Sequence, residues 1–173
     1  MNIGSVVDVT VLLTTFATLI VILDPMGLMP VFLALTSKFS PKAQRKAAVQ
    51  ASLVSFGVIL AFAFLGQQIL RALQISMESL KLSGAGPGAI VAVMVSMAQA
   101  HTTGSIVAVV LAVVATHVVI WASMRFSLEL SRLLRTGGIL LLTKISGVLL
   151  AAIATELVMG GVFDFIKNAG IVK

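Results

Sequence analysis

Five apolar runs, separated by short polar or glycine-rich stretches, dominate the hydropathy pattern of the chain. The runs cover residues 9–35, 47–70, 89–100, 105–123 and 138–160. A helix needs about 20 apolar residues to cross the hydrocarbon of a bilayer, so all but the short third run are long enough or nearly so. Because lipid offers the backbone no hydrogen-bond partners, each run is expected to be helical. The pattern predicts an all-α, multispanning helical membrane protein.

Composition supports this class. Of the 173 residues, 59% are hydrophobic and 10% are charged, whereas soluble domains have about 45–50% and about 25%. The net charge of +6 lies in short clusters without interleaved aromatic residues, so we expect the lipid bilayer as a partner and no nucleic acid. The chain has no cysteine, which excludes disulfides and thiolate-bound metals.

Two basic segments lie between the apolar runs. Residues 37–46 contain four Lys or Arg, and residues 124–137 contain three Arg. The positive-inside rule predicts that both are cytoplasmic, but three complete crossings between them would place them on opposite sides. We therefore expect that a crossing is missing near residues 71–84. The alternative is a re-entrant or interfacial helix over residues 73–83.

Asp24 interrupts the first apolar run, in the sequence Asp24-Pro25-Met26-Gly27-Leu28-Met29-Pro30. An Asp at the centre of a span costs roughly 2.5–3.5 kcal/mol on insertion scales. Pro25 removes a backbone donor, and Gly27 and Pro30 weaken the next turn, so carbonyl groups need new partners there. We predict that Asp24, Pro25, Gly27 and Pro30 form part of a binding site. The alternative is a proline kink in which Asp24 only caps the downstream half-helix.

A second break is expected at Gly84-Ala85-Gly86-Pro87-Gly88. A half-helix that begins at Pro87 would point free N–H groups toward the membrane core and suit a carboxylate. The alternative is a loop and a helix start at the membrane surface. Many secondary transporters hold their substrate between two discontinuous helices of inverted repeats. We therefore predict one transmembrane domain over residues 1–173, with a truncated first repeat (1–83) and a second repeat (84–173).

Three further polar residues lie within apolar runs. Lys144 is a candidate counter-charge for Asp24 or a snorkelling side chain. Glu156, near the end of the last run, is either an interfacial carboxylate or part of a proton relay. His117 either titrates in a coupling step or makes a polar contact between helices. Metalloprotease, P-loop and nucleophile-elbow motifs are absent from the sequence, so we expect no enzyme, catalytic residue, metal or cofactor.

Three segments resemble the MarC family of bacterial integral membrane proteins: LDPMGLMPVFLALTSKFSPKAQRKAA, GAGPGAI and KISGVLLAAIATELVMGG. The resemblance covers nearly the whole chain and is strongest at Asp24-Pro25-x-Gly27-x-x-Pro30. It implies a six-span inner-membrane protein made of two inverted three-helix repeats, and some relatives transport small neutral amino acids. In the family, a third span and a polar loop separate segments that this chain joins directly, between ISMESLKLSG and AGPGAI.

These observations together predict a secondary transporter of small neutral amino acids in the bacterial inner membrane. Gly86, Pro87 and Gly88 are expected to receive the carboxylate of a small zwitterionic solute. Asp24 and the carbonyl groups beside it are expected to receive the ammonium or a coupling cation, either a proton or sodium. The alternative is a membrane protein with a structural or assembly role and no transport. The sequence is also compatible with a homo-oligomer.

Overall fold

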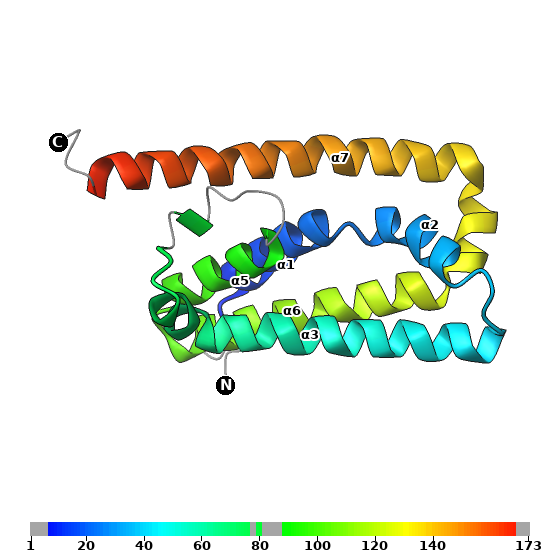
Figure 1. Cartoon of the computed structure of the whole chain (residues 1–173), viewed down its shortest axis with the longest axis horizontal. Helices are drawn as coiled ribbons and strands as arrows, with labels where there is room; N and C mark the ends of the chain where they lie inside the picture. Colours follow the sequence, from blue (N-terminus) through cyan, green and yellow to red (C-terminus); the bar gives the residue numbers. More distant parts are fainter. Residues whose placement is uncertain (1–6, 77–78, 81–87, 169–173) are drawn as a thin grey trace.

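The computed structural model describes residues 7–76, 79–80 and 88–168, and these residues form helices and connecting turns without strands. The helices are α1 (Val9–Leu23), α2 (Pro25–Leu35), α3 (Pro41–Ala72), α5 (Gly88–Gln99), α6 (Thr103–Arg125) and α7 (Ser127–Asn168) (Figure 1). Four stretches are long and apolar enough to cross a membrane: Val9–Leu35, Pro41–Ala72, Thr103–Arg125 and Gly147–Lys167. The prediction of an all-α, multispanning membrane protein is confirmed.

The first span is a broken helix, as the sequence predicts. α1 begins after Asp8, whose side chain accepts a hydrogen bond from the Val11 N–H. It ends at Asp24, which adopts a left-handed backbone conformation with φ of 40°. Pro25 then occupies the first turn of α2, where its missing N–H costs nothing and its fixed φ suits a helix start. The change of direction at Asp24 therefore follows from these two residues.

The long helices α3 and α6 begin at side-chain caps. Ser40 accepts a hydrogen bond from the Ala43 N–H before α3, with Pro41 in the first turn. Thr102 accepts one from the Ser105 N–H before α6. Each cap satisfies a backbone donor that has no partner within the helix.

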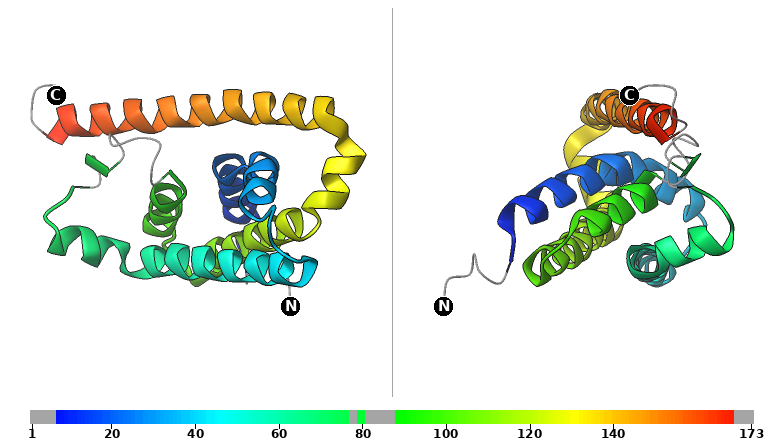
Figure 2. Two further views of the ribbon diagram at one scale, coloured as in Figure 1. Left: turned by 45° about the vertical axis from the view of Figure 1, so that its right-hand side comes forward. Right: turned by 90° about the vertical axis from the view of Figure 1, so that its left-hand side faces the viewer.

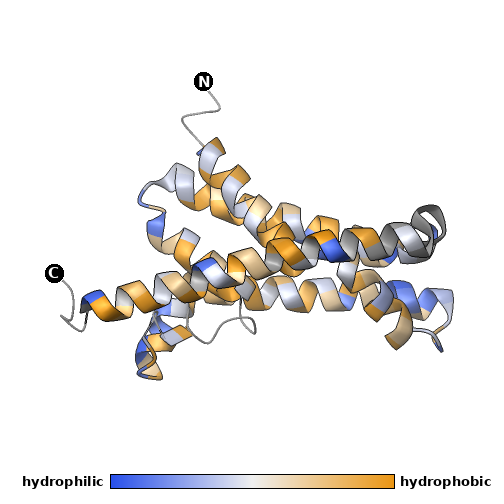
Figure 3. Ribbon diagram, turned by 90° about the horizontal axis from the view of Figure 1, so that it is seen from above, coloured by the Kyte–Doolittle hydropathy of each residue, from blue (hydrophilic) through white to orange (hydrophobic). Residues whose placement is uncertain are grey.

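The core lies where α1, α3, α5 and α6 meet. Leu19, Val93, Val109 and Val113 are fully buried there. The broken helix α1–α2 runs inside the bundle, with α7 on one side and α3 and α6 on the other (Figure 2). Apolar residues cover much of the outer length of the helices (Figure 3), as expected for surfaces that face lipid.

α5 is too short to cross the membrane. Its 12 residues extend about 18 Å, little more than half of a hydrocarbon core of about 30 Å. It begins beside the last turn of α1, where a Cβ on Gly88 would lie 3.2 Å from Ile22 Cγ2. Three residues, 100–102, separate the end of α5 from the start of α6. α5 is therefore a half-span that reaches from the middle of the bundle to the end where α6 starts.

The two basic segments, predicted to lie on the same side of the membrane, lie together in the structure. They share a small concavity at one end of the bundle, which we call the basic patch. It is lined by Pro41, Gln44, Arg45, Met124, Arg125 and Glu129. The count of three complete crossings between them was wrong because it included residues 89–100 as a complete crossing. With a half-span there, the charge pattern by itself no longer requires a missing crossing.

α7 differs from the sequence prediction at its beginning. Residues 127–137, expected in a loop, form the first part of α7, and this part lies across the end of the bundle (Figure 1). Among the described residues, the stretch of α7 that is long and apolar enough to cross a membrane is Gly147–Lys167, which overlaps the predicted run 138–160.

Candidate functional site

Asp24 lies between α1 and α2 and is partly buried. Its Oδ1 accepts a hydrogen bond of 3.1 Å from the Gly27 N–H. A Cβ on Gly27 would approach Asp24 Cγ to 2.9 Å, so only glycine leaves room for this cap. Pro25 is buried and Pro30 is exposed within α2. Asp24 therefore caps the downstream half-helix, as the alternative interpretation of the break expects. Its second carboxylate oxygen, Oδ2, accepts no hydrogen bond from the described residues.

The second break is described only in part. Gly86 and Pro87 lie outside the described residues, as does most of the segment 71–84 from residue 77 onward. Gly88 is buried at the start of α5, against Ile22 of α1. Because Ile22 lies two residues before Asp24, Gly88 lies close to the break between α1 and α2.

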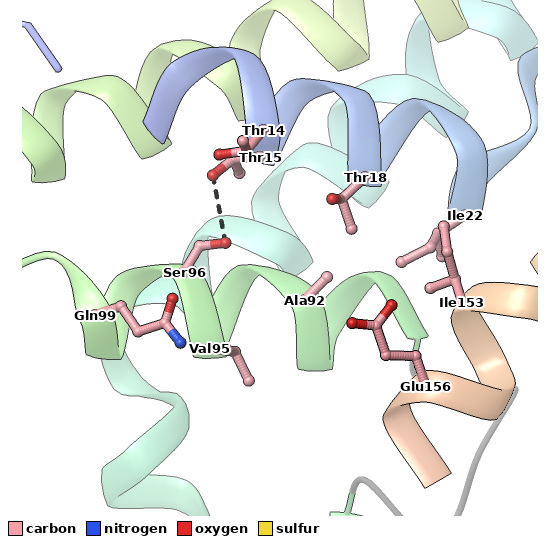
Figure 4. Close-up of a pocket in the computed structure, with 10 residues that line it drawn as sticks. All are labelled: Thr14, Thr15, Thr18, Ile22, Ala92, Val95, Ser96, Gln99, Ile153 and Glu156. Atoms are coloured by element: carbon pink, nitrogen blue, oxygen red, sulfur yellow. Dashed lines mark hydrogen bonds between the residues drawn. The ribbon is translucent and has the colours of Figure 1, made fainter. Parts of the chain in front are cut away.

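A cavity of about 360 Å³ opens between α1, α5 and α7 (Figure 4). This volume falls within the range of about 300–1,000 Å³ that is typical of small-molecule sites. Its lining consists of Thr14, Thr15, Thr18, Ile22, Ala92, Val95, Ser96, Gln99, Ile153 and Glu156. Hydroxyl, amide and carboxylate groups therefore face one space inside a bundle of otherwise apolar helices.

Some of these polar groups are already hydrogen-bonded. Thr15 Oγ1 donates to Ser96 Oγ at 3.3 Å and joins α1 to α5. Thr14 Oγ1 donates to the Thr10 carbonyl of its own helix at 2.8 Å. The side chains of Thr18 and Gln99 make no hydrogen bond with the described residues, so they remain able to bind a solute.

The structure changes the interpretation of Glu156 but not that of Lys144. The Glu156 side chain is exposed and lines the cavity together with Ile22, which lies at the midpoint of the span Val9–Leu35. Its carboxylate points from α7 toward α1 and α5 (Figure 4). Lys144 is exposed and precedes the stretch Gly147–Lys167. Among the residues that the structure describes, Lys144 forms no ion pair with Asp24, and its role as a counter-charge stays a prediction.

His117 makes a polar contact between helices. It is buried on α6, where Nδ1 lies 2.8 Å from the Val113 carbonyl and Nε2 lies 3.3 Å from Ser55 Oγ of α3. The carbonyl can only accept, so Nδ1 carries a proton, and Nε2 of the neutral ring accepts from the Ser55 hydroxyl. The Phe56 ring packs edge-on at 5.3 Å. His117 does not line the cavity, so the structure favours the packing interpretation over the coupling one.

Sequence analysis missed most of the cavity. Thr14, Thr15, Thr18, Ser96 and Gln99 were not among the predicted site residues. The available signal was their spacing, because residues four apart (Thr14 and Thr18) or three apart (Ser96 and Gln99) share one helix face. Polar residues repeated at this spacing inside apolar runs predict a polar stripe, but they do not say which stripes meet.

The fold and the cavity define a multi-pass α-helical membrane protein with a broken first span and a half-span beside it. A family model described as MarC family integral membrane protein matches residues 9–85 and 84–166. The chain therefore belongs to the MarC family.

Relatives agree with this assignment. A UPF0056 membrane protein of Methanocaldococcus jannaschii is 25% identical, and the match covers 90% of this chain and 97% of the relative. The UPF0056 membrane protein YhcE of Escherichia coli is 24% identical over 90% of this chain and 93% of the relative. The UPF0056 inner membrane protein YhgN of Escherichia coli is 36% identical, over 38% of this chain and 34% of the relative. No solved structure gives a significant match.

The alignments also show that this chain is short in its interior. The match to the Methanocaldococcus protein extends over 199 positions but includes 90% of 173 residues, about 156, so about 43 positions have no counterpart here. The two segments matched by the family model meet at residues 84–85. This junction coincides with the point where the sequence analysis placed an interruption.

Proposed function

We propose that this protein is a secondary transporter of small neutral amino acids across the bacterial inner membrane. The observation that carries the proposal is the hydroxyl-lined cavity with a carboxylate at mid-membrane depth, beside the break between α1 and α2. Polar and ionisable groups at this depth are costly, and they commonly mark substrate or ion pathways. Broken helices that meet near the midplane are typical of transporter binding sites.

The cavity chemistry suits a small zwitterion. A volume of about 360 Å³ equals about twelve water molecules at roughly 30 Å³ each, enough for glycine or alanine with some remaining water. Hydroxyl groups both donate and accept, so they can replace water around either charged end of the solute. In this proposal the carboxylate binds near Gly88 at the start of α5. The ammonium or a coupling cation, proton or sodium, binds toward Asp24 or Glu156.

The shared position of the two basic segments supports a cytoplasmic location for the basic patch and residues 37–46. The missing positions, about 43, are enough for one span of about 20 residues, a loop and a first half-span. Together with α5, that half-span would make a complete broken helix. In this proposal, the insertion restores a second discontinuous helix and a six-span protein, and the basic segments stay on one side.

Uptake of radiolabelled glycine and alanine by proteoliposomes tests the proposed function. We expect saturable uptake by a six-span version, in which a relative's interior segment is inserted between residues 84 and 85. Uptake by the present chain shows whether the half-span is sufficient. Empty liposomes and an Asp24→Asn variant serve as controls, and the variant is expected to be inactive. Absence of uptake by both versions, or full uptake by Asp24→Asn, would reject the proposed transport site.

One observation favours a second candidate function. Because Asp24 caps α2 by accepting a hydrogen bond from the Gly27 N–H, capping alone accounts for an aspartate at this break, and a structural or assembly role is consistent with it. Thermal stabilisation of the detergent-purified protein by a panel of amino acids separates the two functions, since a ligand that binds the folded state raises its stability. A flat panel favours the structural role.

A further inference from the structure

Glu156 is the carboxylate whose position most needs an explanation. It lines the cavity together with Ile22 of α1. Ile22 lies thirteen residues from each end of the span Val9–Leu35, so Glu156 lies near the middle of the bundle. A glutamate side chain is too short to reach the headgroups from this depth. An ionised group in such a place needs a partner.

The described residues provide no cationic partner for Glu156. Lys144 and Lys167 lie on the same helix, about 18 Å and 16 Å away along the axis. The other residues that line the cavity are neutral: hydroxyl groups, one amide and aliphatic side chains. The carboxylate thus faces a polar space that contains oxygen ligands and no basic side chain.

We infer that Glu156, with Thr18 of α1, binds one monovalent cationic group in this cavity. Thr18 lines the cavity without using its side chain in hydrogen bonds to the described residues, and Figure 4 places Thr18 and Glu156 on the same side of the cavity, whereas Gln99 lies at its far end. The hydroxyl and the carboxylate are hard oxygen donors with a charge of −1 in total, which matches a single positive charge. Divalent Ca²⁺ commonly takes several carboxylates, and the described residues contain no group of three or more acidic, His or Cys side chains.

Two sources can supply this cationic group: an alkali cation such as sodium, or the ammonium of an amino acid. The ammonium source rests on the proposed function, whereas the alkali source does not. In both, the cation neutralises Glu156 at mid-membrane depth and offsets its desolvation. It would also join α1 to α7, two helices that are distant in sequence.

The packing of α7 predicts a measurable consequence. α7 packs mainly against α2, with fewer contacts to α1 and α6. Little of its stretch Gly147–Lys167 is buried. A cation held between Glu156 and Thr18 fastens this weakly packed part of α7 to α1. Binding should therefore raise the unfolding temperature of the whole chain.

The test measures thermal unfolding of the full chain in detergent at constant ionic strength. One arm replaces choline chloride with sodium chloride, and a second adds glycine in choline chloride. At a hundredfold excess over Kd we expect a rise of about 5–10 °C in at least one arm. Glu156→Gln should abolish the rise, and Thr18→Val should require a higher concentration for half of it. Glu129→Gln, at the other end of α7, should retain it.

The arms identify the source of the cation. A rise with sodium alone indicates an alkali cation, and a rise with glycine alone indicates the solute ammonium. No rise in either arm, or an equal rise in Glu156→Gln, overturns the inference. Uptake separates this result from the proposed function. If the protein transports amino acids but the Glu156→Gln variant keeps the full rise in unfolding temperature, the proposed function stands and the cation site is rejected. If sodium raises the unfolding temperature only when Glu156 is present and no uptake is measured, the cation site stands and the proposed function is rejected.

Discussion

Replacing Asp24 by Asn and by Ala separates the structural role of this residue from its charge. Asp24 caps α2 through Oδ1 and adopts φ of 40°. Asn keeps an oxygen acceptor, caps helices about as well as Asp and tolerates the left-handed conformation. Ala loses the cap and does not favour that conformation. We therefore expect Asp24→Asn to fold with nearly unchanged stability and Asp24→Ala to be clearly destabilised.

The magnitude follows from these two terms. Loss of an N-cap costs about 1 kcal/mol, and a left-handed conformation costs Ala about 1 kcal/mol more. The sum of about 2 kcal/mol corresponds to a loss of about 4–8 °C in unfolding temperature for a chain of this length. Asn should remain within about 2 °C of the parent protein.

Circular dichroism during heating in detergent measures both variants, and uptake by proteoliposomes is measured in parallel. If the proposed function holds, Asp24→Asn is stable and inactive. An Asp24→Ala protein that unfolds at the parent temperature would refute the capping argument. So would an Asp24→Asn protein as unstable as the Ala variant, because charge rather than the cap would then stabilise the break.

Further variants test other parts of the structure. Gly27→Ala should lower the unfolding temperature by at least as much as loss of the Asp24 cap does, since its Cβ collides with the capping carboxylate. The control Gly57→Ala, whose Cβ would have nothing within 4 Å, should be neutral or slightly stabilising. Ser55→Ala removes the hydrogen bond to His117 and should cost about 0.6 kcal/mol, measured by unfolding in mixed detergents. Single cysteines introduced into the α3 and α7 parts of the basic patch should react with an impermeant maleimide from the same side of the membrane; labelling from opposite sides would contradict the half-span geometry.

Much of the fold was predictable from local sequence. Apolar runs of sufficient length predict spans, because lipid excludes every backbone arrangement with unsatisfied hydrogen bonds. Asp24 followed by Pro25 predicts the break in the first span, because proline lacks the N–H and the capping residue accepts a bond from the new helix. These features depend on neighbouring residues only, and the structure confirms them.

The beginning of α7 and the course of α5 were harder to predict from the sequence. The polar residues at 124–137 predicted a loop, whereas residues from 127 onward are helical. α5 was counted as a crossing although its run is short for a span, because the sequence does not show where each end of a helix lies in the bundle. The contact between Gly88 and Ile22 supplies that information, and it is a contact between residues distant in sequence.

The sequence by itself determined the class of protein, the family and the broken first span. Only the tertiary structure decided that Thr18, Gln99 and Glu156 line one cavity and that the two basic segments lie at one end. Periodicity assigns a residue to a face of its own helix. Which faces meet depends on helix packing, and that is set by contacts between segments far apart in the chain.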